Sequence, residues 1–220
     1  EEMARRGARV TVVAGRHSAD LPRRENLNGV KVIRLRPLTR IDKGIILPSL
    51  VPRVAALGRR ADVVMPVLPL LEAGLLSLAL PRRSVLPVYV CDLRLGSGAL
   101  GRVIERVAAS SARWAVSRAT AHIALSEDYA GASRVIRRYA SRTAGIEPPV
   151  DPDAYFPVDP DDLRRRLGIG TAPVVGFVGR LVMEKGVDHL IRAMRLVRQA
   201  NPAAVLVIAG EGRKVAGGGV

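Results

Sequence analysis

The sequence predicts an α/β protein with parallel sheets, and three observations lead to this prediction. Short apolar runs alternate with segments of helical period along most of the 220 residues, as in strands joined by helices. The runs at 174–178 and 204–209 contain no polar side chain, which is typical of parallel strands buried on both faces. Hydrophobic residues make up 48% of the chain, which is enough for a buried core.

The first part of the chain contains most of the predicted elements. Residues 1–6, Gly7 and the apolar residues 10–14 indicate the end of a helix, the glycine that closes it and a first strand. A helix is predicted over 101–118. Further strands are predicted at 30–35, 62–67, 84–90, 120–125 and 143–146. These elements predict one domain over residues 1–150.

A linker is predicted at 151–173, because this stretch is rich in proline and aspartate. Its aspartates are Asp151, Asp153, Asp159, Asp161 and Asp162. The linker separates the domain at 1–150 from a second sheet that starts at Val174, so two domains are predicted.

Residues 174–209 form one predicted βαβ unit. Between the two apolar runs, Val187, Leu190, Ile191, Met194 and Val197 fall on one helical face, while charged residues fall on the other. The Asn-Pro pair at 201–202 ends the helix, since proline cannot continue it. A right-handed crossover that places the helix on the sheet is expected.

The loop after the first of these strands carries the candidate site. Ligands of open α/β sheets bind beyond the carboxyl ends of the strands, where this chain has Gly179, Arg180, Lys185 and Gly186. The glycines allow the backbone to approach a ligand, and the helix that begins near Gly186 presents free N–H groups to an anion. Gly210 ends the second strand at the same crevice. The pattern predicts a phosphate or diphosphate site, and the alternative is a solvated loop.

The wider pattern around this loop resembles a known family. The string G-R-L-x-x-E-K-G-V-x-x-L-I-x-A from Gly179, followed by an apolar strand and Gly-Glu-Gly at 210–212, is similar to the start of the nucleotide-binding domain of family 4 glycosyltransferases of the GT-B fold. The resemblance implies that Arg180 and Lys185 contact the diphosphate of a nucleotide sugar and act as the catalytic cations. It also implies that Gly179, Gly186 and Gly210 line the donor site.

The resemblance extends over the first part of the chain. Residues 4–13 are similar to the family's first helix and second strand, and Ala-Leu-Ser-Glu-Asp-Tyr at 124–129 resembles a strand-to-helix corner of the family. Residues 146–157 resemble its I-P-x-x-V-D-x-x-x-F-x-P linker. The implied fold is of the GT-B type, with an acceptor-side Rossmann-like domain at 1–150 and the start of the nucleotide-sugar-binding domain at 174–220.

Two parts of the family fold lie outside the sequence. The first strand with its glycine-rich loop is absent before Glu1, and the second donor-binding signature, two glutamates separated by seven residues, is absent after Gly212. We therefore expect a fragment of a longer protein, with a truncated second domain, and the fragment alone could be inactive.

The chain departs from the family near Cys91. Relatives often carry a histidine at this position or at Val90, and this chain has none there, so Asp92 is the only ionisable group left on the acceptor side. Cys91 is expected to be a small buried residue without chemistry.

The three histidines, His17, His122 and His189, are not spaced in the sequence as the ligands of a metal site usually are. No metal site and no cofactor besides the donor substrate are predicted.

Charge is concentrated in the first part of the chain. Residues 1–150 contain 25 basic and 12 acidic side chains, a net +13, of the +15 of the whole chain. This excess suggests an anionic partner. Nucleic acid is not expected, because only 3% of residues are aromatic.

In the predicted helix 101–118, Arg102, Arg106 and Arg113 lie on one face, and Val103, Val107 and Trp114 lie on another. A solvated face is one interpretation, and contact with an anionic membrane surface is the other.

The predicted location rests on the number of cysteines and on the length of the apolar segments. A single cysteine fits a reducing compartment, so the expected location is the cytoplasm, with peripheral contact at the inner face of the membrane as an option. The apolar region 68–80 contains Glu72 and is shorter than the roughly 20 residues needed to cross a bilayer.

The predicted function is transfer of a hexosyl or other glycosyl group from a nucleotide diphosphate sugar to a hydroxyl of a glycan or lipid acceptor. The resemblance implies retention of configuration, and a role in polysaccharide or glycolipid biosynthesis. Two alternatives stay open. One is a nucleotide-sugar epimerase of similar architecture, which the loop at 179–186 fits less well. The other is a non-catalytic basic module that binds polyanions.

Overall fold

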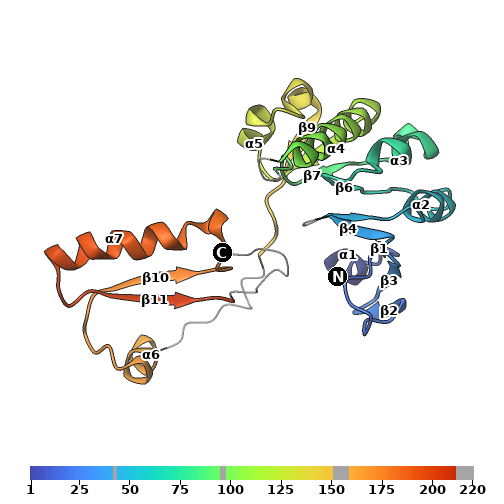
Figure 1. The fold of residues 1–220 in the computed structure, drawn as a ribbon. Helices are drawn as coiled ribbons and strands as arrows, with labels where there is room; N and C mark the ends of the chain where they lie inside the picture. Colours follow the sequence, from blue (N-terminus) through green and yellow to red (C-terminus); the bar gives the residue numbers. More distant parts are fainter. Residues whose placement is uncertain (42–43, 95–97, 151–158, 212–220) are drawn as a thin grey trace. The chain divides into compact units, whose positions relative to one another are not determined.

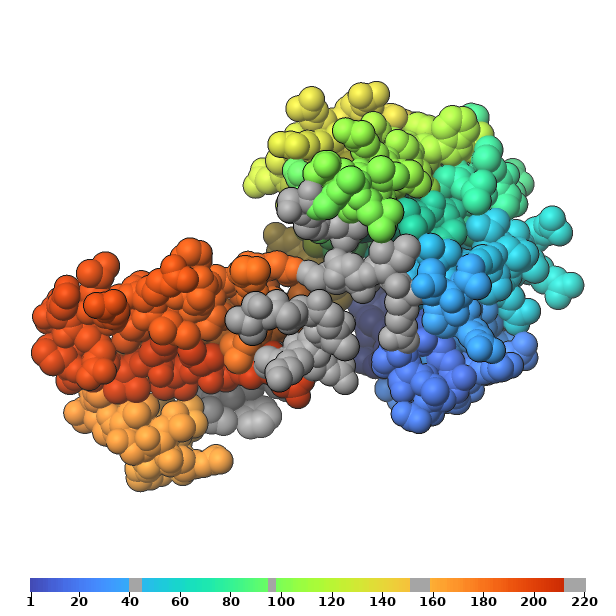
Figure 2. All heavy atoms as spheres, viewed as in Figure 1, coloured from blue at the N-terminus to red at the C-terminus, as the bar shows by residue number. Residues whose placement is uncertain are grey.

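The computed structural model describes residues 1–41, 44–94, 98–150 and 159–211. The chain folds into two compact units, Glu1–Pro149 and Val150–Val220. Helices and parallel strands occur in both units (Figure 1). Figure 2 colours the atoms of the first unit from blue to yellow and those of the second from orange to red. The predicted α/β class is confirmed.

The first unit opens with a short helix and a three-stranded sheet. Helix α1 (Glu2–Arg5) is followed by Gly7, which has a φ of 90°. Strands β1 (Thr11–Gly15) and β3 (Val30–Leu35) are parallel, which confirms the strands predicted there. Strand β2 (Arg24–Leu27) pairs with β3 in antiparallel orientation. It is absent from the predicted strands because its sequence, Arg-Glu-Asn-Leu, contains no apolar run.

A short hairpin and two helices follow this sheet. Strands β4 (Thr39–Ile41) and β5 (Gly44–Ile46) are antiparallel. Helices α2 (Leu50–Gly58) and α3 (Ala73–Ala79) come next. The buried side chains of Leu47, Leu50 and Leu76 pack against half-buried residues of β1, β3, β5 and α2, so one apolar core connects these elements.

The second sheet of this unit has four parallel strands in chain order. They are β6 (Val67–Leu68), β7 (Val88–Tyr89), β8 (His122–Ala124) and β9 (Thr143–Gly145). Strands β8 and β9 match the predicted strands, whereas β6 and β7 are much shorter than the runs at 62–67 and 84–90. Pro66 and Pro87 directly precede β6 and β7, and a proline has no N–H to donate to the ladder.

The connections between these strands are mainly helical. They contain the 3-10 helices η1 (Arg82–Ser84) and η2 (Arg137–Arg142) and the α-helices α4 (Ala99–Arg118) and α5 (Glu127–Ala132). The main core of the unit consists of side chains from this sheet and these helices, including Leu68, Tyr89, Ala112, Val116 and Ile136.

Helix α4 buries a different face from the apolar one noted in the sequence. Its buried residues are Ala108, Ala112, Ala115 and Val116, whereas Val103, Val107 and Trp114 are each more than half exposed. The small alanines let the helix approach its neighbours closely. Beside these alanines, the Gly74 N–H of α3 donates a hydrogen bond to the Ser111 hydroxyl of α4 at 2.8 Å.

The second unit contains the predicted βαβ unit. Strands β10 (Val174–Val178) and β11 (Val205–Ala209) are parallel, with Val174 opposite Val205. Between them, η4 (Met183–Lys185) leads into helix α7 (Val187–Ala200), which runs along the strand pair (Figure 1). Met194 is its buried residue. The strands and the helix are therefore confirmed.

The stretch predicted as a linker contains a helix. Helix α6 (Pro160–Leu167) begins after Asp159, whose side chain accepts a hydrogen bond from the Asp161 N–H at 2.9 Å, and ends at Gly168 with a φ of 64°. Aspartate at the cap, proline in the first turn and glycine after the last turn are strong helix signals. Asp151, Asp153 and the Phe156-Pro157 pair of the linker motif lie outside the described residues.

Within the described ranges, no helix is both long enough and apolar enough to span a membrane.

Candidate functional site

The candidate site is the loop between β10 and α7. The loop is attached to the neighbouring strand end through two backbone hydrogen bonds. The Gly179 N–H donates to the Ala209 carbonyl at 3.0 Å, and the Leu181 N–H donates to the Glu211 carbonyl at 3.1 Å. Arg180 lies between these two bonds, so its backbone is held at the carboxyl ends of both strands.

Gly210 packs directly against the start of this loop. A Cβ atom added to Gly210 would lie 1.8 Å from the carbonyl oxygen of Gly179, a distance that no side chain tolerates. Glycine is therefore required at 210 by the close approach of two backbones. Two of the three glycines predicted to line the site, Gly179 and Gly210, therefore lie side by side.

The second half of the loop turns the chain into α7. The Lys185 N–H donates to the Val182 carbonyl at 2.9 Å, and the Gly186 N–H donates to the Met183 carbonyl at 3.1 Å. Gly186 has a φ of 65° and a ψ of 25°, a left-handed conformation that favours glycine. This turn places Lys185 one residue before the N-cap of α7.

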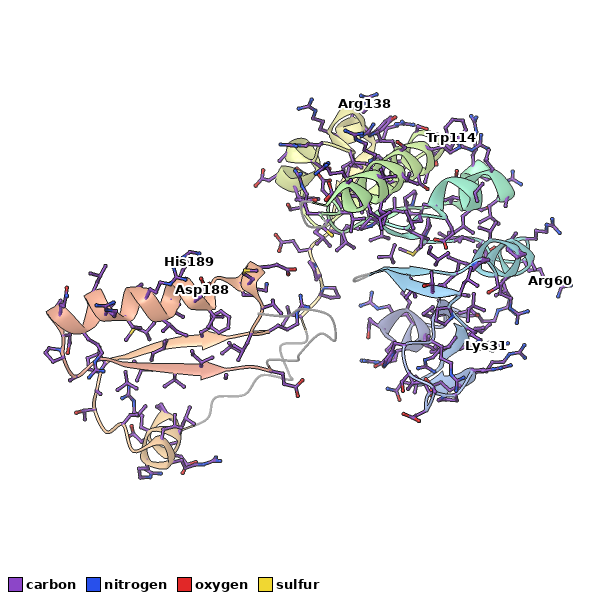
Figure 3. All side chains as sticks on the ribbon, in the orientation of Figure 1. Lys31, Arg60, Trp114, Arg138, Asp188 and His189 are labelled. Atoms are coloured by element: carbon purple, nitrogen blue, oxygen red, sulfur yellow. The ribbon has the colours of Figure 1, made fainter. Side chains whose placement is uncertain are left out.

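The N-terminus of α7 has no side-chain cap. The N–H groups of the first turn of a helix have no acceptor within the helix, and this end carries the positive end of the dipole. Asp188, in the first turn, pairs with Arg192 at 3.2 Å and lies 3.8 Å from His189; Asp188 and His189 are adjacent on the helix in Figure 3. The first turn can therefore still accept an anion.

Arg180 and Lys185 are both exposed. Neither side chain makes a hydrogen bond or ion pair with another residue in the part of the chain that the structure describes. The structure brings together Gly179, Arg180, Lys185, Gly186 and Gly210 around the two strand ends and the start of α7. Their contact with a nucleotide sugar stays a prediction.

Asp92, the acceptor-side candidate, is held by three hydrogen-bond donors. The Tyr89 hydroxyl donates to Oδ1 at 2.8 Å, the Ser133 hydroxyl donates to Oδ1 at 2.6 Å, and the Arg134 N–H donates to Oδ2 at 3.2 Å. Burial raises the pKa of Asp92, but these donors outweigh it and leave the pKa below the ordinary 3.8. Asp92 thus fixes β7 to the region after α5, a role that no local sequence pattern reveals because Asp92 and Ser133 are far apart in the chain.

Cys91 differs from its prediction because it is exposed rather than buried. The short strand β7 ends at Tyr89, so Cys91 lies beyond the sheet. Partial burial, and secondarily the charge of Asp92, raise the pKa of the thiol, so the nucleophilic thiolate is disfavoured.

The histidines are separate from one another in role and environment. His122 is fully buried on β8, whereas His17 and His189 are exposed. Among the described residues, no group of three or more His, Cys, Asp or Glu side chains could hold a metal ion. Independence from metal stays a prediction.

Two family models match successive parts of the chain. Residues 1–149 match the family model described as glycosyl transferase 4-like domain, and residues 159–217 match the one described as glycosyl transferases group 1.

Two curated relatives are similar to parts of the chain. The GDP-mannose-dependent alpha-(1-6)-phosphatidylinositol monomannoside mannosyltransferase of Mycolicibacterium smegmatis is 44% identical over 70 residues, which cover 30% of this chain and 18% of that protein. The 2-deoxystreptamine glucosyltransferase of Streptomyces kanamyceticus is 32% identical over 105 residues, which cover 46% of this chain and 27% of that protein.

A solved structure shares the fold. Anabaena HepE in complex with UDP superposes with a TM-score of 0.52 at 24% identity, covering 84% of this chain and 48% of HepE. The chain therefore spans about half the length of HepE. Because one family model covers more than half of the chain, the chain belongs to the glycosyl transferase 4-like family, whose members are family 4 glycosyltransferases of the GT-B fold.

Proposed function

We propose that the protein containing this chain transfers a sugar from a nucleotide diphosphate sugar to a hydroxyl group, and that residues 179–186 hold the diphosphate. One observation carries the proposal. The exposed cations Arg180 and Lys185 flank the uncapped start of α7 at the carboxyl ends of β10 and β11. In open α/β sheets this is the position where ligands bind, and a helix N-terminus there favours phosphate.

The chemistry follows from the charge that develops on the departing diphosphate. A guanidinium can donate two parallel hydrogen bonds to phosphate oxygens, and an ammonium supplies a compact positive charge. Cations fixed where negative charge develops stabilise the transition state. Arg180 supplies the first group and Lys185 the second, so the transfer does not depend on a divalent metal ion.

The names of the two curated relatives support a hexosyl donor and a hydroxyl acceptor. One is a GDP-mannose-dependent mannosyltransferase of phosphatidylinositol monomannoside, and the other is a glucosyltransferase of 2-deoxystreptamine. Retention of configuration is part of the proposal through the family resemblance. Because Asp92 is engaged by three donors, we assign it a structural role and no proton transfer.

The test is a transfer assay with the complete protein. UDP-glucose and GDP-mannose are offered with a panel of hydroxyl acceptors, and the released nucleotide and the glycosylated product are both measured. Formation of a glycoside with release of the nucleoside diphosphate supports the proposal. Interconversion of the sugar without transfer would instead support the epimerase alternative.

Contact with a membrane surface is a second candidate, and one observation favours it. Helices α3 and α4 line a groove of about 470 Å³ that contains Leu75, Leu78, Val107 and Trp114 next to Arg106. Trp114 is 51% exposed and Leu75 is 59% exposed. Exposed apolar side chains beside arginines suit the boundary between anionic headgroups and acyl chains. We therefore propose that this groove contacts an anionic membrane.

A further inference from the structure

A pocket of about 460 Å³ in the first unit is lined almost entirely by arginines. Its lining residues are Arg16, Arg23, Arg24, Ile33, Arg34, Leu35, Arg36 and Arg53. All of them lie in the unit Glu1–Pro149, whereas the loop at 179–186 belongs to the other unit. The pocket therefore consists of residues of the first unit alone and shares no residue with the proposed diphosphate site.

The topology of the first sheet brings these arginines together. Parallel strands β1 and β3 end side by side, with Gly15 opposite Leu35, and the Arg16 N–H donates to the Leu35 carbonyl at 2.8 Å. Arg16 and Arg36 directly follow the two strands. Antiparallel β2 begins at this same end, where Arg24 is opposite Ile33. The arginines thus gather at the carboxyl ends of β1 and β3, and α2 adds Arg53.

Two of the six arginines stabilise the wall of the pocket. The Arg16 Nε donates to the Leu21 carbonyl at 2.7 Å, and the Arg34 Nη1 donates to the Pro22 carbonyl at 3.2 Å. Arg34 also pairs with Glu25, and their side chains are only 13% and 22% exposed. These contacts hold the segment before β2 in place, so the pocket is built on fixed backbone.

The other four arginines are Arg23, Arg24, Arg36 and Arg53. Across the described residues of the chain, none of their side chains makes a hydrogen bond or ion pair. Four uncompensated guanidinium groups around one pocket repel one another, and an oxyanion with several acceptor oxygens would relieve this repulsion. Guanidinium groups match phosphate in geometry because each can donate two parallel hydrogen bonds.

We propose that this arginine pocket binds a phosphate group carried by the molecule that accepts the sugar. The volume suits one small headgroup or phosphorylated ring. The role as acceptor site rests on the proposed function, whereas phosphate binding does not. The phosphate can belong to a free small molecule or to a lipid headgroup, since both present the same oxygens.

Binding of inorganic phosphate to the 220-residue chain tests the proposal by calorimetry in a phosphate-free buffer of low ionic strength, with Arg180→Gln and Lys185→Gln present in every protein compared so that the loop at 179–186 does not contribute. The pocket variant carries Arg23→Gln and Arg24→Gln, and the matched control carries Arg137→Gln and Arg138→Gln, two exposed arginines of the same unit. Because a charge-assisted hydrogen bond contributes about tenfold in affinity, the pocket variant should bind phosphate at least about tenfold more weakly. The control should bind like the unchanged chain.

A third variant, Arg180→Gln with Lys185→Gln, separates this proposal from the transferase proposal. It should lose transfer activity in the complete protein while the pocket's phosphate binding persists. Equal affinity in the pocket variant and the unchanged chain, or an equal loss in the control, would overturn the assignment. The phosphate affinity of an Arg23→Lys, Arg24→Lys variant should lie between those of the unchanged chain and the pocket variant, because lysine keeps the positive charge and loses the paired hydrogen-bond donors.

Vesicles distinguish the two sources of phosphate. Phosphatidylcholine vesicles with and without 10 mole per cent phosphatidylinositol are added to the unchanged chain and the pocket variant. Retention of the unchanged chain alone on the phosphatidylinositol vesicles, released by free phosphate, identifies a lipid headgroup. Saturable binding of free phosphate without retention on vesicles identifies a soluble ligand. Retention of both proteins alike, together with no saturable phosphate binding, would contradict the proposal.

Discussion

The backbone of Gly210 lies so close to that of Gly179 that a Cβ atom at 210 would be 1.8 Å from the Gly179 carbonyl oxygen. The contact joins the ends of β10 and β11, since the Gly179 N–H also donates to the Ala209 carbonyl. The geometry of the loop that carries Arg180 thus depends on the absence of a side chain on the neighbouring strand.

Gly210→Ala should therefore displace the Arg180 loop. Inserting a methyl group into a closely packed site costs about 1–3 kcal/mol, and the displaced cation should raise the KM for the donor in the complete protein. Gly176→Ala is the matched control, because a Cβ on Gly176 of β10 has no atom within 4 Å. Thermal unfolding and donor kinetics of both variants check the prediction. Identical behaviour of the two variants would refute the close contact.

His122 makes the first unit sensitive to mild acid. Burial, and secondarily the charge of Arg142, lower the pKa of His122 from 6.5 to about 4. The Thr143 hydroxyl contacts Nε2 and donates to the Tyr139 carbonyl, so Nε2 donates to Thr143. Nδ1 is buried and has no partner among the described residues. The fold thus accommodates only the neutral ring.

Because the pKa is lower in the folded state, this contribution to stability is complete above about pH 6.5 and declines as the pH falls toward 4. The total is on the order of 3 kcal/mol. His122→Gln has no group that titrates in this range, so its urea-unfolding free energy should decline less between pH 6.5 and 4. Parallel declines for the two proteins would contradict the assignment.

The Tyr89 hydroxyl should stabilise the first unit through Asp92. Tyr89→Phe removes one of three donors to a carboxylate, which costs about 1–3 kcal/mol for a hydrogen bond to a charged group. The lowered pKa of Asp92 means that this stability exists above the ordinary pKa and is lost as the pH falls through the folded value. The stability difference between Tyr89→Phe and the unchanged chain should therefore shrink below about pH 4.

Tyr139→Phe is the control for this experiment, because the Tyr139 hydroxyl makes no hydrogen bond with another described residue. Its stability should stay within about 0.5 kcal/mol of the unchanged chain. A loss in Tyr139→Phe equal to that in Tyr89→Phe would show that the Asp92 bond contributes nothing specific.

Trp114 reports on membrane contact directly, because it is the single tryptophan of the chain and is 51% exposed. Its emission should shift to the blue and gain intensity when vesicles of phosphatidylglycerol are added, since the ring leaves water. Arg106→Gln with Arg113→Gln should weaken the affinity for these vesicles about 30-fold, because each basic residue near the surface contributes about 1 kcal/mol. The control is Arg137→Gln with Arg138→Gln; Arg138 and Trp114 are labelled in Figure 3. An emission spectrum unchanged by vesicles would exclude the contact.

The sequence predicts the βαβ unit well because β10 and β11 are uninterrupted apolar runs with clear ends. It predicts β6 and β7 poorly because Pro66 and Pro87 remove donors within longer apolar runs. The apolar pattern does not predict strand β2. The pair Asn28-Gly29, with φ values of 49° and 83°, is nevertheless a strong hairpin signal between β2 and β3.

The Arg180 loop and the arginine pocket also differ in how far the sequence alone predicts them. The Arg180 loop is contiguous in sequence, so a local pattern is sufficient to find it. The arginine pocket gathers residues from 16 to 53, and the pairing of β1, β2 and β3 together with the position of α2 brings them together. Likewise, the buried face of α4 is made mostly of alanines, whose burial depends on close packing rather than on hydrophobicity along the chain.

The most direct test of the proposed function is the transfer rate of the complete protein carrying Arg180→Ala, Lys185→Ala or both. Each loss of a charge-assisted hydrogen bond to the diphosphate should cost about 1.5–3 kcal/mol, or about 10- to 150-fold in kcat/KM. Arg195→Ala, on the exposed surface of α7, is the control and should retain full activity, with or without a metal chelator. Turnover of the double variant that matches the Arg195→Ala control would contradict the assignment of this loop as the diphosphate site.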